Sequence, residues 1–191
     1  ADPESGWRTN RSRYITDRRI RTHLEGGTSI AAQSRTFTPF LAIDLDDHGD
    51  RADLERRYDQ TRVAFPDHRP IIESTPNGGL HLWFLLWKKS WAIPVNAYGT
   101  DLLRMVGLQI HPGKVEVFPH DEQMLRLPLG RGCLLLDDDL VPVGDYEESK
   151  LCLQRAFLYD QIDRLTVPES YRATETPRQN RKCSGGGSGY M

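Results

Sequence analysis

The sequence is poor in cysteine and has no long hydrophobic run. Its three cysteines, Cys133, Cys152 and Cys183, are odd in number and form no Cys-x-x-Cys pair, so neither a disulfide framework nor a zinc site is expected. No apolar stretch approaches the roughly 20 residues that a transmembrane helix requires, and no secretory signal is visible. These absences predict a globular protein of the reducing cytoplasm that does not contact a membrane.

Charged residues are unevenly distributed along the chain. The formal net charge is −2, yet residues 1–24 hold six arginines against three acidic residues, and residues 168–191 are also basic. An acidic centre with basic flanks suits a metal site served by phosphate-binding arms, although arginine-rich ends are often simply solvated. We expect a basic segment with a helix at 1–24, a folded domain at 25–167, and a flexible Gly/Ser-rich tail or linker at 168–191. That linker suggests a chain cut from a longer protein.

Hydrophobic periodicity and turn residues predict an α+β fold. The expected helices cover residues 16–24, 51–65, 94–106 and 149–165, and the expected strands cover residues 36–44, 71–74, 80–87, 114–118, 124–127 and 133–136. Asp50 is suited to cap the second helix, with Leu54, Tyr58 and Val63 facing inward. Residues 75–79, Thr-Pro-Asn-Gly-Gly, are a strong signal for a hairpin between two strands.

Two carboxylates one residue apart end an apolar strand, Phe-Leu-Ala-Ile-Asp-Leu-Asp at residues 40–46. Side chains alternate along a strand, so Asp44 and Asp46 share a face at about 6.5 to 7 Å spacing. Mg²⁺ prefers carboxylate and phosphate oxygens, and shared aspartates can hold two ions roughly 3.5 to 4 Å apart. The pair predicts metal-dependent phosphate chemistry. The other interpretation is a buried strand that ends in a polar turn.

A glycine-rich turn delivers a histidine to the start of an apolar strand. The segment from Ser74 to His81 reads Ser-Thr-Pro-Asn-Gly-Gly-Leu-His. Glycines let backbone amides approach a phosphate, and an imidazole can donate a hydrogen bond to a phosphate oxygen. A structural histidine fits the same position. Trp83, on the same strand face as His81, suits either stacking on a base or packing into the core.

Single charges among apolar residues mark two later segments. Glu116 stands between two valines in Lys-Val-Glu-Val-Phe-Pro and faces opposite to them. A carboxylate there is costly to bury unless it is paired or binds a cation, so Glu116 is either a third metal ligand or a solvent-exposed residue of an edge strand. Arg126, in Leu-Arg-Leu-Pro-Leu-Gly, has a guanidinium that forks onto the oxyanions of a triphosphate.

In their order and flanks these motifs resemble the catalytic domain of the archaeo-eukaryotic primase superfamily, the primase-polymerases of plasmids, phages, mobile elements and conflict systems. An apolar strand that ends Asp-x-Asp is similar to residues 43–46, the small-x-His motif is similar to residues 79–81, and an apolar residue followed by an acid is similar to residues 115–116. The flanks Val-Glu-Val-Phe-Pro and Leu-Arg-Leu-Pro-Leu-Gly resemble the mobile-element and conflict-system branch. The resemblance covers roughly residues 20–140, and Glu116 stands where many relatives have aspartate.

The resemblance implies an RRM-like antiparallel sheet packed with helices and joined to a smaller α/β unit, with the active site in the cleft between them. Domain 25–167 would be a primase-polymerase catalytic domain. Three residues would be catalytic and would bind two Mg²⁺ or Mn²⁺ ions: Asp44, Asp46 and Glu116. Three would bind the incoming nucleotide: His81, Ser74 and Arg126. The implied activity is that of a DNA primase/polymerase of DNA replication, a nucleotidyltransferase that joins NTPs or dNTPs on a single-stranded DNA template. Its implied partners are template, primer strand and a helicase portion of a longer chain.

Two other functions fit part of the pattern. A haloacid-dehalogenase-type phosphatase also opens with a strand that ends Asp-x-Asp, and it would use Asp44 as a nucleophile with Ser74 and acids from residues 137–139. It requires alternating strands and helices, which the short strands between residues 114 and 136 disfavour. A catalytically inactive RRM-like nucleic-acid-binding module would use Trp83 and neighbouring aromatics for stacking, but it gives the three acids no role.

Overall fold

A computed structural model describes residues 16–32, 36–120 and 123–172, so most of the basic segment and of the predicted tail lie outside the described residues. The elements in chain order are α1 (Asp17–Leu24), β1 (Ala31–Ala32), β2 (Phe37–Leu45), α2 (Arg51–Ala64), β3 (Ile71–Ser74), β4 (Leu80–Trp91), α3 (Ala92–Met105), β5 (Val115–Phe118), β6 (Leu125–Arg126), β7 (Leu134–Leu136), α4 (Tyr146–Leu158), β8 (Arg164–Leu165) and α5 (Glu169–Arg172). This mixture confirms the α+β class. None of the helices in the described ranges is long and apolar enough to cross a membrane.

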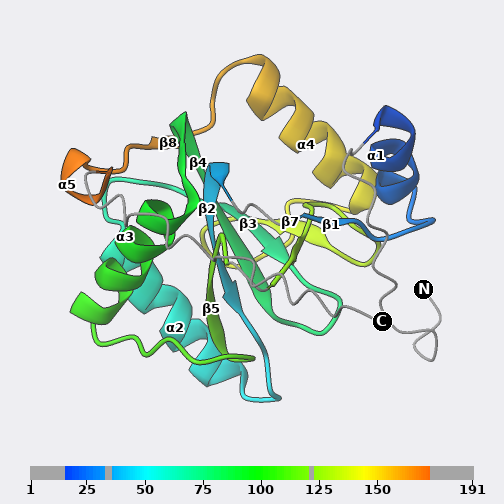
Figure 1. Cartoon of the computed structure of the whole chain (residues 1–191). Helices are drawn as coiled ribbons and strands as arrows, with labels where there is room; N and C mark the ends of the chain where they lie inside the picture. Colours follow the sequence, from blue (N-terminus) through cyan, green and yellow to red (C-terminus); the bar gives the residue numbers. More distant parts are fainter. Residues whose placement is uncertain (1–15, 33–35, 121–122, 173–191) are drawn as a thin grey trace, which may run out of the picture.

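Six strands form one open sheet at the centre of the molecule (Figure 1). The hydrogen-bonded order is β5-β2-β4-β3-β7, and each neighbouring pair on this path is antiparallel, while β8 pairs in parallel with β4. The predicted hairpin joins β3 to β4, and its turn is closed by a hydrogen bond from the amide of Thr75 to the carbonyl of Gly79 at 2.8 Å. β2 and β4 therefore lie inside the sheet, and β5 is an edge strand.

Helices α2 and α3 cover one face of this sheet (Figure 1). The core on this face is built from alternate residues of three strands: Leu41, Ile43 and Leu45 from β2, Leu82 and Phe84 from β4, and Val115 and Val117 from β5. Leu54 and Tyr58 of α2 are buried against them as expected. Val63 is exposed, because nine steps of about 100° from Leu54 place it on the opposite side of the helix.

A smaller group of elements lies on the other side of the sheet. β1 and β6 form a two-stranded antiparallel sheet. The buried side chain of His23 ties α1 to this group: its Nε2 lies 3.0 Å from the carbonyl of Leu127, and its Nδ1 accepts from the amide of Ile30 at 3.0 Å. A second core, which contains Trp83 and Leu125, joins β6 to the main sheet. Trp83 is thus buried in a core, which is one of the two roles predicted for it.

The last long helix begins and ends earlier than the sequence suggested. We expected a helix over residues 149–165, whereas α4 starts at Tyr146 behind a capping box made by Asp145 and Glu148. The chain leaves the helix at Asp160, whose φ of 48° is left-handed, and it then returns to the main sheet as β8. The apolar periodicity of the sequence continues past this turn because Leu165, the buried residue of β8, is also apolar.

The predicted flexible tail begins with an ordered turn. Residues 169–172, which we assigned to the tail, form the short helix α5. The hydroxyl of Tyr171 donates a hydrogen bond to Oδ2 of Asp101 at 3.1 Å, and the ring packs against the main core. The Gly/Ser-rich part of the tail lies outside the described residues.

Candidate active site

One row of polar side chains crosses the sheet on the face turned away from α2 and α3. Asp44 of β2 is paired in register with His81 of β4 on one side and with Glu116 of β5 on the other. Glu73 of β3 continues the row beyond His81. Residues directly opposite each other in antiparallel strands share a face, with Cβ atoms about 4.5 to 5.5 Å apart. The strand register therefore gathers four ionisable side chains from separate segments.

Asp44 has a strongly perturbed carboxyl group. Its Oδ1 is buried, has no hydrogen-bond partner in the described part of the chain, and lies 3.6 Å from Nε2 of His81. Burial raises the pKa of Asp44 from 3.8 to about 6; nearby His81 opposes this shift, and the charges of Asp46 and Glu116 add to it. A carboxyl group whose buried oxygen lacks a hydrogen bond can bind a cation or a proton.

Asp46 lies directly after β2, close enough for its charge to act on Asp44. Burial and the neighbouring charge of Glu116 raise its pKa. Its backbone is held by Arg57 of α2, a buried side chain whose guanidinium donates to the carbonyls of Asp46 at 2.9 Å and of Lys114 at 2.6 Å. Arg57, which the sequence analysis did not single out, thus fixes the end of β2 against the start of β5.

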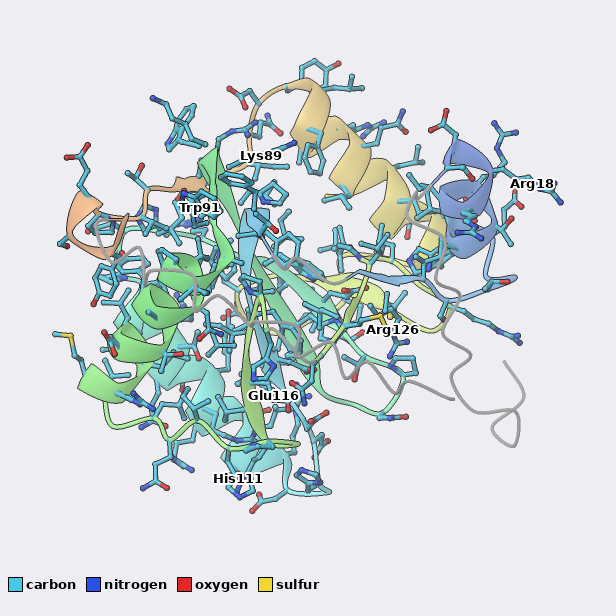
Figure 2. All side chains as sticks on the ribbon, viewed as in Figure 1. Arg18, Lys89, Trp91, His111, Glu116 and Arg126 are labelled. Atoms are coloured by element: carbon cyan, nitrogen blue, oxygen red, sulfur yellow. The ribbon has the colours of Figure 1, made fainter. Side chains whose placement is uncertain are left out.

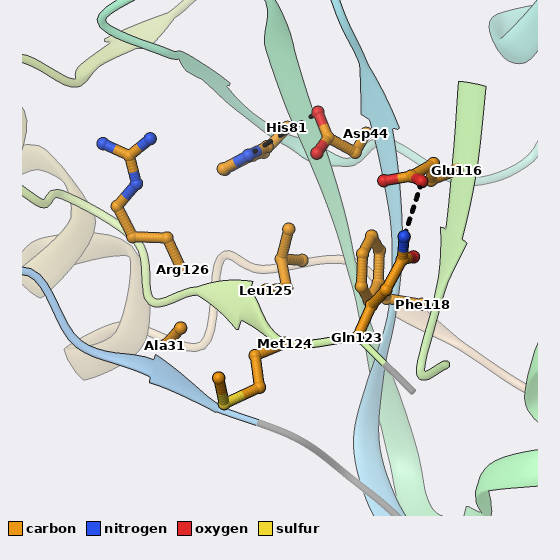
Figure 3. A pocket seen from close by; sticks show the side chains of 9 residues that line it. All are labelled: Ala31, Asp44, His81, Glu116, Phe118, Gln123, Met124, Leu125 and Arg126. Carbon is orange, nitrogen blue, oxygen red and sulfur yellow. Dashed lines mark hydrogen bonds and ion pairs between the residues drawn. The ribbon is translucent and has the colours of Figure 1, made fainter. Parts of the chain in front are cut away.

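Glu116 is half-buried at the edge of the sheet. As expected, it points away from the two flanking valines, which are buried in the core on the helix-covered face. Its Oε1 accepts hydrogen bonds from Nε2 of Gln123 at 2.9 Å and from the amide of Gly113 at 3.2 Å. The other oxygen points toward Asp44 of the neighbouring strand (Figure 3).

A pocket of about 300 Å³ opens between this row and the small β1–β6 sheet (Figure 3). Asp44, His81 and Glu116 line one wall, and Arg126 of β6 lines the other. The Nε of Arg126 is buried without a hydrogen-bond partner among the described residues, and Nη1 lies 3.8 Å from Sγ of Cys133. Burial raises the pKa of Cys133 to about 12, so this thiol stays neutral and does not balance the guanidinium. The pocket therefore has an acidic wall and a cationic wall.

Glu73 is a buried residue of the site that the sequence analysis did not identify. Its side chain is completely buried and accepts from the amide of Leu129 at 2.6 Å and from Nε1 of Trp83 at 3.2 Å. Its Oε2 also lies 3.3 Å from Nδ1 of His81, so Glu73 holds the imidazole from behind while Nε2 faces Asp44. A lone acid beside two isoleucines, Ile-Ile-Glu-Ser, was the sequence signal that could have revealed it.

Ser74 does not line this pocket. Its hydroxyl accepts from the amide of Leu134 at 3.1 Å and lies 3.4 Å from the carbonyl of the same residue. These contacts tie β3 to β7. Ser74 is thus engaged by the sheet, while the other five residues singled out from the sequence lie on or beside the acidic and cationic walls.

The acidic wall offers oxygen ligands of the kind that bind divalent cations, but these side chains are not arranged around a common ion position. In the described ranges, no group of three or more His, Cys, Asp or Glu side chains is arranged to hold a metal ion. Oxygen ligands of Asp44, Asp46 and Glu116 nevertheless suit Mg²⁺ or Mn²⁺, and the unpartnered Oδ1 of Asp44 is a buried acceptor that a cation would satisfy.

No known protein-family model matches the chain, and no curated protein is significantly similar to it.

Proposed function

We propose that the chain is the catalytic domain of a template-dependent nucleotidyltransferase, a DNA primase/polymerase. The observation that carries this proposal is the row of Asp44 and Glu116, with Asp46 beside it, facing Arg126 across one pocket. Carboxylates that hold cations and an arginine that binds oxyanions are the two groups that a metal–triphosphate complex requires.

The order of the strands supports an RRM-like core. The succession β2-α2-β3-β4-α3-β5 is a βαββαβ unit, and within it the sheet order β5-β2-β4-β3 is antiparallel throughout. A four-stranded antiparallel sheet of this kind is the framework of RRM domains. The elements α1, β1, β6 and α4 would form the smaller α/β unit, and the pocket lies between β6 and the sheet.

Asp44, Asp46 and Glu116 would hold two Mg²⁺ or Mn²⁺ ions. When bound, such ions supply Lewis-acid activation of a 3′-hydroxyl and stabilise the departing pyrophosphate. The protein contributes the positioning of these carboxylates: the strand register sets Asp44 opposite Glu116, and Arg57 fixes the backbone of Asp46. Substituting these acids would remove the ligands.

Arg126 and His81 would bind the triphosphate. The guanidinium of Arg126 has a buried N–H without a partner among the described residues, and a phosphate oxygen would satisfy it. Because Nδ1 faces the carboxylate of Glu73, His81 presents Nε2 to the pocket; with a proton on both ring nitrogens it can donate to Glu73 and to a phosphate oxygen at once. Ser74 has a smaller expected role, because its hydroxyl already bonds to Leu134.

The alternatives fit the structure less well. A haloacid-dehalogenase-type phosphatase needs alternating strands and helices in a parallel sheet, whereas the path β5-β2-β4-β3-β7 is antiparallel. Oδ1 of Asp137, an acid that this alternative would recruit, accepts from the amides of Asp139 and Val141 in its own turn. A simple binding module gives no reason to keep Asp44 buried without a hydrogen-bond partner.

Nucleotide incorporation into a primed single-stranded template tests the proposal. The wild-type protein should extend the primer with Mg²⁺ or Mn²⁺, and the Asp44→Ala/Asp46→Ala variant should not. Glu55→Ala/Asp59→Ala, which removes two exposed acids of α2, is the matched control and should retain activity. Equal products from the wild type and from the Asp44→Ala/Asp46→Ala variant would refute the proposal, and a trapped phosphoenzyme would support the phosphatase instead.

A further inference from the structure

The outer end of β4 exposes large aromatic side chains far from the pocket. Trp87 is 63% exposed and Trp91 is 39% exposed, and Phe37 at the outer end of β2 is 50% exposed. The rings of Phe37 and Trp91 lie against each other with centroids 4.2 Å apart, tilted by 32°. Aromatic rings of this size are normally buried, so their exposure on neighbouring strands marks an interaction surface.

This surface is also positively charged. Lys88 and Lys89 stand between the two tryptophans in sequence, where the register of β4 against β2 shifts between Leu85 and Ser90, and both are exposed. The guanidinium of Arg164 lies 5.5 Å from the ring centre of Trp87, and its Nη2 forms an ion pair with Oδ1 of Asp160 at 3.0 Å. Residues 26–43 and 74–100, which include all of β2 up to Ile43 and all of β4, contain no Asp or Glu although the sequence has 27 of them. The two strands are therefore depleted of negative charge where the aromatics are exposed.

We propose that these five residues form a binding surface for single-stranded nucleic acid, which we call the β4 platform: Phe37, Trp87, Lys88, Lys89 and Trp91. Unpaired bases stack on exposed aromatic rings, and lysines contact the phosphates between them. Duplex DNA keeps its bases stacked inside and cannot use the rings. The combination of rings with cations therefore selects single strands.

The β4 platform and the pocket are connected by one strand. Trp87 follows His81 by six residues along β4, a span of about 20 Å at the usual strand rise. Figure 2 shows Lys89 and Trp91 toward one end of the central sheet and Glu116 toward the other. A single strand bound to the platform can therefore extend toward the pocket. Its use there as a template rests on the proposed function, whereas binding to the platform does not.

The test is the affinity for a fluorescently labelled 20-nucleotide single strand of thymidines, measured by anisotropy without nucleotide or metal. Trp87→Ala/Trp91→Ala should bind at least tenfold more weakly, because each lost stacking contact is worth about 1 to 3 kcal/mol. Lys88→Gln/Lys89→Gln should lower the slope of log K against log salt by about one per lysine. Arg104→Ala/Met105→Ala, which removes an exposed cation and an exposed apolar side chain from α3, is the matched control and should bind normally.

Unchanged affinity in both platform variants would overturn the inference, and so would equal affinity of the wild type for duplex and single strand. Because all four substituted residues are exposed, circular dichroism should show native folding; the lysine variant alone decides the matter if the tryptophan variant does not fold.

Asp44→Ala/Asp46→Ala separates this inference from the proposed function. Loss of binding in the platform variants with no incorporation by the wild type supports the platform and refutes the polymerase. Incorporation with intact binding in both platform variants does the reverse.

Discussion

At the scale of single residues, the buried carboxyl group of Asp44 is the clearest sign of a functional site. Its Oδ1 lacks a hydrogen bond in the described structure, and burial raises its pKa to about 6. A group selected only for stability would be paired or exposed. A raised pKa and a buried oxygen without a hydrogen bond are typical of sites that bind a ligand.

The raised pKa of Asp44 predicts a stability that falls with pH. The native state binds the proton more tightly than the unfolded chain, so the free energy of unfolding decreases between about pH 4 and 6 and stays reduced above pH 6. The cost is on the order of 2 to 3 kcal/mol. Asp44→Asn should therefore be more stable than the wild type at pH 7.5, and urea unfolding at pH 4.5 and 7.5 measures the difference. Asp59→Asn, on the exposed side of α2, should show no change. A less stable Asp44→Asn at pH 7.5 would contradict this account.

Glu73 is predicted to be essential for the local structure behind His81. Glu73→Ala leaves the amide of Leu129 and Nε1 of Trp83 buried without their acceptor, so it should lower the free energy of unfolding by about 3 to 5 kcal/mol. Glu73→Gln keeps an acceptor oxygen and should lose less. Denaturant unfolding of both variants checks this ordering, and a fully stable Glu73→Ala protein would show that these bonds do not matter.

At the scale of elements, the β3–β4 hairpin explains why a small residue precedes Leu80 and His81. A Cβ atom added to Gly79 would lie 2.6 Å from the carbonyl oxygen of Leu45 and 3.2 Å from Cα of Asp46. These contacts are with backbone, which cannot move aside cheaply. The hairpin therefore packs directly on the end of β2 that carries the aspartates, and glycine permits this approach.

Gly79→Ala is accordingly predicted to damage both stability and activity. The collision must shift either the hairpin or the end of β2, at a cost of about 1 to 3 kcal/mol, and the shift displaces Asp46 relative to Asp44. Thermal unfolding and primer extension should both report the loss. Asn77→Ala, at the exposed tip of the same hairpin, is the control and should be nearly neutral. Normal unfolding and extension by Gly79→Ala would mean that the approach is not tight.

Most elements could be predicted from the sequence because their signals are local. Apolar alternation, the Asp50 cap and the turn at residues 75–79 identified β2, α2 and the hairpin closely. The end of α4 could not be predicted in this way, because the turn at Asp160 has no glycine and the buried residues beyond it, Ile162 and Leu165, keep a helical spacing. The order of α5 depends on a contact with Asp101, which lies far away in the sequence.

At the scale of the whole molecule, the sequence singled out four of the residues that line the pocket but did not predict how they meet. Alternation assigned Asp44, Asp46 and Glu116 to particular strand faces, yet the pairing of Asp44 with both His81 and Glu116 is set by the sheet order. Arg126 lines the pocket from a different sheet, and no local sequence pattern predicts that this sheet lies beside the Asp44 row. Glu73 and Arg57 were missed because their importance lies in long-range hydrogen bonds.

The central claim is template-directed nucleotide transfer at the pocket, and incorporation opposite four homopolymer templates tests it most directly. With Mn²⁺ and each nucleotide offered singly, the wild-type protein should incorporate only the nucleotide complementary to the template. Arg126→Ala should lose most of this activity through a higher KM for the nucleotide, and Asp44→Ala should abolish it. Incorporation that ignores the template base, or that persists in Asp44→Ala, would contradict the account.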